Sequence, residues 1–71
     1  MKLNYDTETD SLYIELKSTP SQDSKEVAEG LVLDFDGNGN IVGIDIQHAS
    51  TNLDLNTLEI DSLPTKKPSK S

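Results

Sequence analysis

The stretch that decides the fold reads LVLDFDGNGNIVGIDIQ and runs from Leu31 to Gln47. Apolar and polar residues alternate on either side of its centre, which is typical of two strands that each bury one face. Residues 36–39 at the centre are Asp-Gly-Asn-Gly, and these types close hairpins because glycine takes positive φ and Asn and Asp tolerate it. The stretch therefore predicts a β-hairpin with a core face of Leu33, Phe35, Val42, Ile44 and Ile46 and a solvent face of Asp34, Asp36 and Asp45.

The N-terminal part of the chain predicts a second hairpin. Apolar residues alternate with polar ones in residues 2–6 and again in residues 12–17. The polar residues between these segments are turn formers. Tyr5 and Tyr13 have no basic neighbours that would help them stack on nucleic-acid bases, so we expect them to pack across this hairpin.

The rest of the chain has weaker patterns. Residues 18–24 include a proline and no apolar residue, which predicts an exposed loop, and residues 25–29 follow as a short extended piece. Residues 52–59 fit neither the helical nor the strand period, so either a short helix capped by Asp54 or an irregular apolar strap is expected.

The fold class that follows is α+β and mainly β. We expect a small antiparallel sheet of about four strands built from two hairpins, with one short helix or strap near residues 52–59. Residues 1–62 form a single β-rich domain, and the Lys, Pro and Ser tail over residues 63–71 is predicted to be disordered.

Size and composition limit what this domain does. A chain of 71 residues buries only about 60% of the surface that it exposes when unfolded, so its core is small. The chain has no cysteine, which excludes disulfides and thiolate metal sites and leaves dimerisation as one open way to gain buried surface. No apolar run reaches signal-peptide or membrane-spanning length, so we expect a soluble, cytoplasmic protein that does not bind membranes.

The charge of the chain is strongly acidic. The net charge is −7, and the thirteen acidic residues against Lys2, Lys17 and Lys25 leave −10 on the domain without its tail. Nucleic acid is an unsuitable partner, because affinity for its phosphates comes from Lys and Arg. A basic protein is the electrostatically favoured partner, although such a charge also simply keeps a small domain soluble.

The central turn resembles a calcium-binding loop. Residues 34–45 match the twelve-residue EF-hand pattern, with oxygen-bearing side chains at Asp34, Asp36 and Asn38 and a carboxylate at the twelfth position. An EF-hand needs a helix on each side, however, and here the flanks have strand periodicity and contain Gly30 and Gly43. Hairpin turn chemistry is thus favoured, and these three residues remain the only metal-site candidates.

The remaining candidates for catalytic residues do not form a recognisable active-site pattern in the sequence. His48 is the only histidine, and the paired carboxylates Asp6 and Asp10, and Asp34 and Asp36, lie in polar turns that suit capping rather than acid–base work. We therefore expect no catalytic residue, no cofactor and no enzymatic activity.

Several motifs together resemble a known prokaryotic family. They are Tyr5-Asp6, Asp10-Ser11-Leu12-Tyr13-Ile14, Asp34-Phe35-Asp36, Val42-Gly43-Ile44-Asp45 and Ala49-Ser50. Over residues 1–52 the sequence resembles the domain-of-unknown-function family 2283 (DUF2283), and it departs from the family pattern at Asp45, where glutamate is usual, and in its tail.

The resemblance implies a compact β-sheet domain with a small helical element, of bacterial or phage-like origin, and no established activity or catalytic residue. It also implies a partner, because members of the family are often encoded beside small toxin-like proteins.

Charge and resemblance together favour a non-enzymatic protein-interaction module, an antitoxin-like partner of a basic protein encoded nearby. Two alternatives stay open. One is a weak cation-binding protein that uses the turn from Asp34 to Asn38, and the other is a self-associating structural protein, for example a homodimer.

Overall fold

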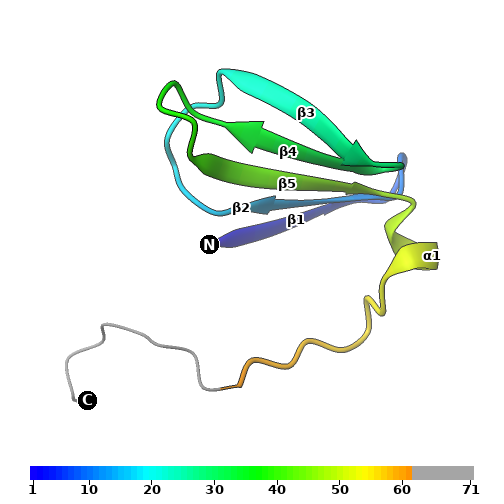
Figure 1. Ribbon diagram of the computed structural model, residues 1–71. Helices are drawn as coiled ribbons and strands as arrows, with labels where there is room; N and C mark the ends of the chain where they lie inside the picture. Colours follow the sequence, from blue (N-terminus) through cyan, green and yellow to red (C-terminus); the bar gives the residue numbers. More distant parts are fainter. Residues whose placement is uncertain (62–71) are drawn as a thin grey trace, which may run out of the picture.

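The computed structural model describes residues 1–61. They form one antiparallel sheet with the strands β1 (Lys2–Asp6), β2 (Ser11–Glu15), β3 (Asp23–Ala28), β4 (Leu31–Phe35) and β5 (Ile41–Gln47), followed by the helix α1 (Ala49–Asn52). The strand order is β1-β2-β5-β4-β3, so the last strand lies at the centre between β2 and β4 (Figure 1). The predicted mainly β fold is confirmed, whereas the tail expected at residues 63–71 lies outside the described residues.

The hairpin of β4 and β5 forms as the sequence predicts. Leu33 pairs with Ile44, and the connection turns over residues 36–40. Gly39 has a φ of 84°, and the carboxylate of Asp36 accepts the N–H groups of Asn38 and Asn40, each at 2.9 Å. Local turn chemistry is therefore what joins these strands.

The sheet has five strands, so the expectation of about four was wrong. The additional strand is β3, which pairs with β4 and occupies an edge of the sheet. Every residue of this strand is exposed, so neither of its faces needs apolar side chains. Its sequence, DSKEVA, therefore lacks the apolar alternation that predicts a strand. Backbone pairing across the tight connection at Gly30, where φ is 78°, makes this segment a strand.

The helix also lies elsewhere than predicted. Its four residues end at Asn52, before the segment near 52–59 where the sequence placed a helix or strap. Asp54 accepts the N–H of Asn56, at 3.2 Å, and no helix follows it up to residue 61, where the described part of the chain ends. Residues 53–61 are thus the irregular alternative, which we call the strap (Figure 1). No helix within residues 1–61 has the length and apolar character needed to cross a membrane.

The two faces of the sheet differ in chemistry. Strand pairing places two rows of side chains on one side, the apolar face: Leu3, Ile14, Ile44, Leu33 and Lys25, and Tyr5, Leu12, Ile46, Leu31 and Ala28. The opposite side, the polar face, has the rows Lys2, Glu15, Gly43, Asp34 and Ser24, and Asn4, Tyr13, Asp45, Val32 and Glu26. The predicted sides of Leu33, Ile44 and Ile46, and of Asp34 and Asp45, are confirmed.

The core is smaller than the sequence suggested. Among the described residues only Leu12, Val42 and Ala49 are buried hydrophobics. Val42 is an extra residue at a bulge, since Asp34 pairs with Gly43 and Phe35 with Ile41. The other predicted core residues are only partly covered, because residues 1–61 place no second layer of secondary structure on the apolar face.

Candidate functional site

Tyr13 crosses the central strand on the polar face. It lies on β2, and its phenol ring passes over Gly43 of β5 so closely that a Cβ at Gly43 would overlap the hydroxyl of Tyr13. Gly43 is not among the residues with positive φ, so this position needs glycine for space and not for backbone conformation. A glycine inside a β-branched strand is the sequence signal for such an approach. From the sequence, Gly43 is interpreted only as a residue that disfavours a helix after the turn.

Asp34, on the far side of β5 from Tyr13, accepts a hydrogen bond from the Tyr13 hydroxyl. Tyr13 Oη donates to Asp34 Oδ2 at 2.8 Å, and Ser24 Oγ donates to Asp34 Oδ1 at 2.6 Å. These two bonds connect β2, β4 and β3 across the polar face. Tyr13 therefore does not pack with Tyr5 as expected, because Tyr5 belongs to the apolar face.

Carboxylates surround the Tyr13 hydroxyl. The hydrogen bond to Asp34 is the main cause that raises the pKa of Tyr13 to about 12, with smaller contributions from partial burial and from the charges of Asp34, Glu15 and Asp45. Pairing places the carboxylates of Asp6, Glu15, Glu26, Asp34 and Asp45 on this face, with Lys2 as its basic residue. The polar face therefore carries a strong negative charge.

The three metal-site candidates do not form one ligand set. Asp36 and Asn38 meet in the turn, but there the Asp36 carboxylate accepts backbone N–H groups and also the side-chain amide of Asn40, at 3.4 Å. Asp34 instead points to the polar face, where both of its oxygens accept hydroxyl groups. Within residues 1–61 no group of three or more His, Asp or Glu side chains is arranged to hold a metal ion.

Asp10 forms a second polar junction, at the end of the first hairpin. Its Oδ1 accepts the Tyr5 hydroxyl at 2.7 Å and the Ser50 N–H at 3.0 Å, and its Oδ2 accepts the Ser50 hydroxyl at 2.8 Å. Its backbone carbonyl accepts the N–H of Ala49 at 2.9 Å. The bonds from Tyr5 and Ser50 hold the pKa of Asp10 below its ordinary value. This residue, expected to cap a turn, fixes the start of α1 instead.

His48 and Asp6 have local roles. His48 adopts the left-handed conformation at φ 52° immediately before α1 and makes no side-chain cap bond there. Asp6 accepts the N–H of Glu8 at 3.0 Å, so its predicted capping role is confirmed. Neither residue joins the polar network around Asp34.

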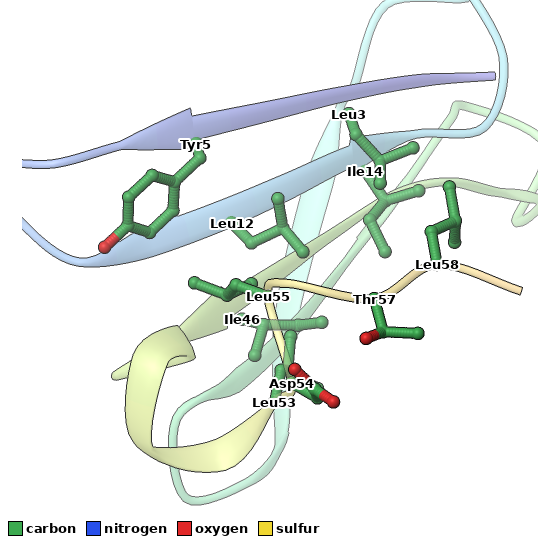
Figure 2. A pocket seen from close by; sticks show the side chains of 10 residues that line it. All are labelled: Leu3, Tyr5, Leu12, Ile14, Ile46, Leu53, Asp54, Leu55, Thr57 and Leu58. Atoms are coloured by element: carbon green, nitrogen blue, oxygen red, sulfur yellow. The ribbon is translucent and has the colours of Figure 1, made fainter.

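An apolar groove lies between the strap and the apolar face. Its volume is about 470 Å³. Figure 2 shows Leu55 and Leu58 of the strap facing β1, β2 and β5. The lining residues are Leu3, Tyr5, Leu12, Ile14, Ile46, Leu53, Asp54, Leu55, Thr57 and Leu58. The strap closes this groove only partly, since Leu55 is 41% and Leu58 72% exposed.

Comparisons with known proteins identify a family for this chain and no individual relative. No curated protein and no solved structure matches the chain. One family model, described as a protein of unknown function (DUF2283), matches residues 2–50. The match contains all five strands, Asp10, Ser50 and the Tyr13–Asp34 pair, and it ends before the strap. The chain therefore belongs to the DUF2283 family.

Proposed function

We propose that the protein is a non-enzymatic interaction module whose polar face binds a basic protein. The observation that carries the proposal is the composition of that face, where five strand carboxylates, namely Asp6, Glu15, Glu26, Asp34 and Asp45, stand with one lysine, Lys2. A surface of one sign attracts an oppositely charged partner and speeds the encounter.

The backbone beneath these carboxylates favours binding. They project from paired strands, and the bonds from Tyr13 and Ser24 fix Asp34 in place. A partner therefore meets a surface whose geometry exists before binding, so little conformational entropy is lost on association. Lysine and arginine side chains of a partner are the natural counterpart for such carboxylates.

The direction of the pKa shifts argues against acid–base catalysis. Asp10 and Asp36 have lowered pKa values, through hydrogen bonds that favour their ionised forms. Tyr13 has a pKa raised to about 12, so it stays protonated at neutral pH. A general acid needs a carboxyl pKa raised toward neutrality, and a tyrosine base needs a lowered one.

The family resemblance suggests the kind of partner. A small basic toxin-like protein encoded beside this chain fits the charge of the polar face, which makes an antitoxin-like role our specific form of the proposal. The cation-binding alternative receives less support, because Asp34 and Asp36 use their oxygens within the protein.

The test is co-expression with the products of neighbouring genes, followed by pull-down and a salt titration. We expect a stoichiometric complex with a basic product that weakens as salt rises, because exposed charges are screened. The variant Glu15→Gln with Asp45→Asn removes two charges from the polar face without breaking the Tyr13–Asp34 bond.

The matched control removes two charges elsewhere. Asp54 and Glu59 lie on the exposed strap, so Asp54→Asn with Glu59→Gln changes the net charge equally. We expect the first pair to weaken the complex at least about tenfold and the second to leave it nearly unchanged. Equal effects of both pairs, or no basic partner at all, would refute the proposal.

A further inference from the structure

The first strand leaves one edge of the sheet open. Within residues 1–61, β1 has a single neighbour, β2, and pairs with it over all five residues without a register shift (Figure 1). Each of these five residues is exposed. The opposite edge differs, because a register shift between Glu26 and Ala28 interrupts the pairing of β3. A regular, exposed edge such as β1 is one to which a further strand can add.

The side chains of β1 define the strand that would fit this edge. Leu3 and Tyr5 line the groove on the apolar face, yet they remain 48% and 40% exposed. Lys2, Asn4 and Asp6 alternate with them and belong to the polar face. An added strand must therefore supply apolar side chains on one face and charges of the opposite sign on the other.

The sequence of β1, Lys-Leu-Asn-Tyr-Asp, meets these requirements itself. When two copies of β1 run antiparallel and are centred on Asn4, Lys2 lies opposite the partner's Asp6, and Leu3 lies opposite the partner's Tyr5. Opposite charges that face each other across strands stabilise a sheet, and the Leu3 and Tyr5 pairs bury apolar surface. The two Asn4 amides meet at the centre, where each can donate and accept a hydrogen bond.

Other registers lose these pairs. A shift by one residue would place apolar side chains opposite polar ones, so only registers centred on alternate faces of the same kind are allowed. Centring on Leu3 or on Tyr5 leaves two strand residues of each copy outside the pair and separates Lys2 from the partner's Asp6. The register centred on Asn4 is thus the one that uses the whole strand.

The acidic character of the chain opposes self-association in general, so the charges near this edge decide whether it is possible here. Each copy has a net charge of −7. In the joined sheet, Lys2 stands between Glu15 of its own copy and the partner's Asp6, so the signs alternate along this row. The turn carboxylates Glu8 and Asp10 follow Asp6 in the sequence, so on the partner they also face the Lys2 end of β1.

The strap carries three further carboxylates, Asp54, Glu59 and Asp61. Its groove is lined by β1, β2 and β5, of which β2 is the middle strand. In the joined sheet the two β2 strands are three strand spacings apart, which is about 14 Å. Exposed charges separated by more than about 8 Å are largely screened at physiological salt. The straps of the two copies therefore repel one another only weakly.

We propose that two copies join at β1, antiparallel and centred on Asn4, and form one continuous sheet of ten strands. The two-fold axis is perpendicular to the sheet, so the apolar faces of both copies lie on the same side. The contact is isologous and closes at the dimer. It is only one strand wide, so it belongs to the weak interfaces that bury less than about 1,200 Å² in total, and the dimer is reversible.

Sedimentation equilibrium of the full chain and of two charge variants tests this arrangement. We expect a species of twice the 7.8 kDa chain mass to form as the concentration rises. Lys2→Glu and Asp6→Lys should each raise the dissociation constant by at least about tenfold, because each places like charges opposite one another twice in the dimer. An equal mixture of the two variants should dimerise nearly as well as the wild type, because every position 2 then faces an opposite charge at position 6.

Lys25→Glu is the matched control, since it changes the net charge as Lys2→Glu does but lies on β3, at the other edge of the sheet. It should leave the dissociation constant nearly unchanged. Three results would overturn the proposal: a wild-type chain that stays monomeric up to about 1 mM, an equal effect of Lys25→Glu, or a mixture of the two β1 variants that does not recover. Recovery in the mixture also shows that both variants are folded.

A second measurement identifies the contact itself. In a mixture of isotope-labelled and unlabelled chains, filtered nuclear Overhauser effects should connect the Leu3 methyl groups of one copy to the Tyr5 ring of the other. A dimer without these contacts would contradict the register. Neither measurement contains a basic partner, so the dimer and the proposed function stand or fall separately.

Discussion

The phenol ring of Tyr13 lies over the backbone of Gly43, and its hydroxyl reaches Asp34 because Gly43 has no side chain in its path. Three neighbouring strands therefore depend on one another through side chains that are far apart in the sequence. This relationship gives a stability prediction.

Gly43→Ala should lower the free energy of unfolding by about 1–3 kcal/mol, as expected when an added methyl group displaces a packed side chain. The added Cβ overlaps the Tyr13 hydroxyl, so the ring must move and the bond to Asp34 is lost. Urea unfolding followed by circular dichroism measures the change.

The control for that prediction is a double-mutant cycle. In a Tyr13→Ala background the ring is absent, so Gly43→Ala should be much less destabilising than in the wild type. Additive effects of the two replacements would contradict the close approach of Tyr13 to Gly43.

Tyr13 should titrate near pH 12 in the folded protein, and the chain should lose stability in alkali. Its pKa is raised above the ordinary value of 10.0, chiefly by the bond to Asp34. The stabilisation is therefore complete below pH 10 and is lost as the pH rises through about 12. Ultraviolet absorbance of tyrosinate, measured in a Tyr5→Phe variant, follows Tyr13 alone.

Asp34→Asn is the control for this titration. An amide has no charge to oppose tyrosinate, so the midpoint for Tyr13 should move down toward its ordinary value. A folded wild-type midpoint near pH 10, or one that Asp34→Asn leaves in place, would contradict the assignment.

Acid should release the junction at Asp10. The pKa of Asp10 is lowered from 3.8 by bonds from Tyr5 and Ser50, so its contribution is present above about pH 4 and is lost as the pH falls through the lowered pKa. Asp10→Asn should reduce stability at neutral pH and flatten the acid side of the stability profile. Glu59→Gln on the exposed strap is the charge-matched control and should leave that profile nearly unchanged.

Calcium should leave the β4–β5 turn unmoved. Asp36 accepts the N–H groups of Asn38 and Asn40, and a metal ion would have to compete with them for its oxygens. We expect the amide resonances of residues 34–40 to keep their positions at millimolar calcium in nuclear magnetic resonance spectra. Saturable shifts confined to these amides would favour the cation-binding alternative.

The parts of the fold that the sequence predicted are those set by local chemistry. Asp36 and Gly39 close their turn with hydrogen bonds that span at most a few residues. The alternation of apolar and polar residues around Leu33 and Ile44 predicts the face of the sheet on which each side chain lies. Such features depend on residue types and period alone.

The parts that the sequence missed depend on contacts between distant residues. β3 is a strand because of its pairing with β4, although each of its side chains is exposed. The helix starts at Ala49 because Asp10 binds Ser50, which is 40 residues away. The role of Gly43 requires knowing that Tyr13 lies across it.

The strand β3, which was not predicted from the sequence, also protects its edge of the sheet against pairing with other chains. β3 is a sheet edge, and an open edge offers unpaired N–H and C=O groups to any other chain. Asp23, Lys25 and Glu26 place charges along that edge, and a register shift between Glu26 and Ala28 interrupts its regular spacing. Both features hinder the edge-to-edge pairing with other chains from which fibrils grow.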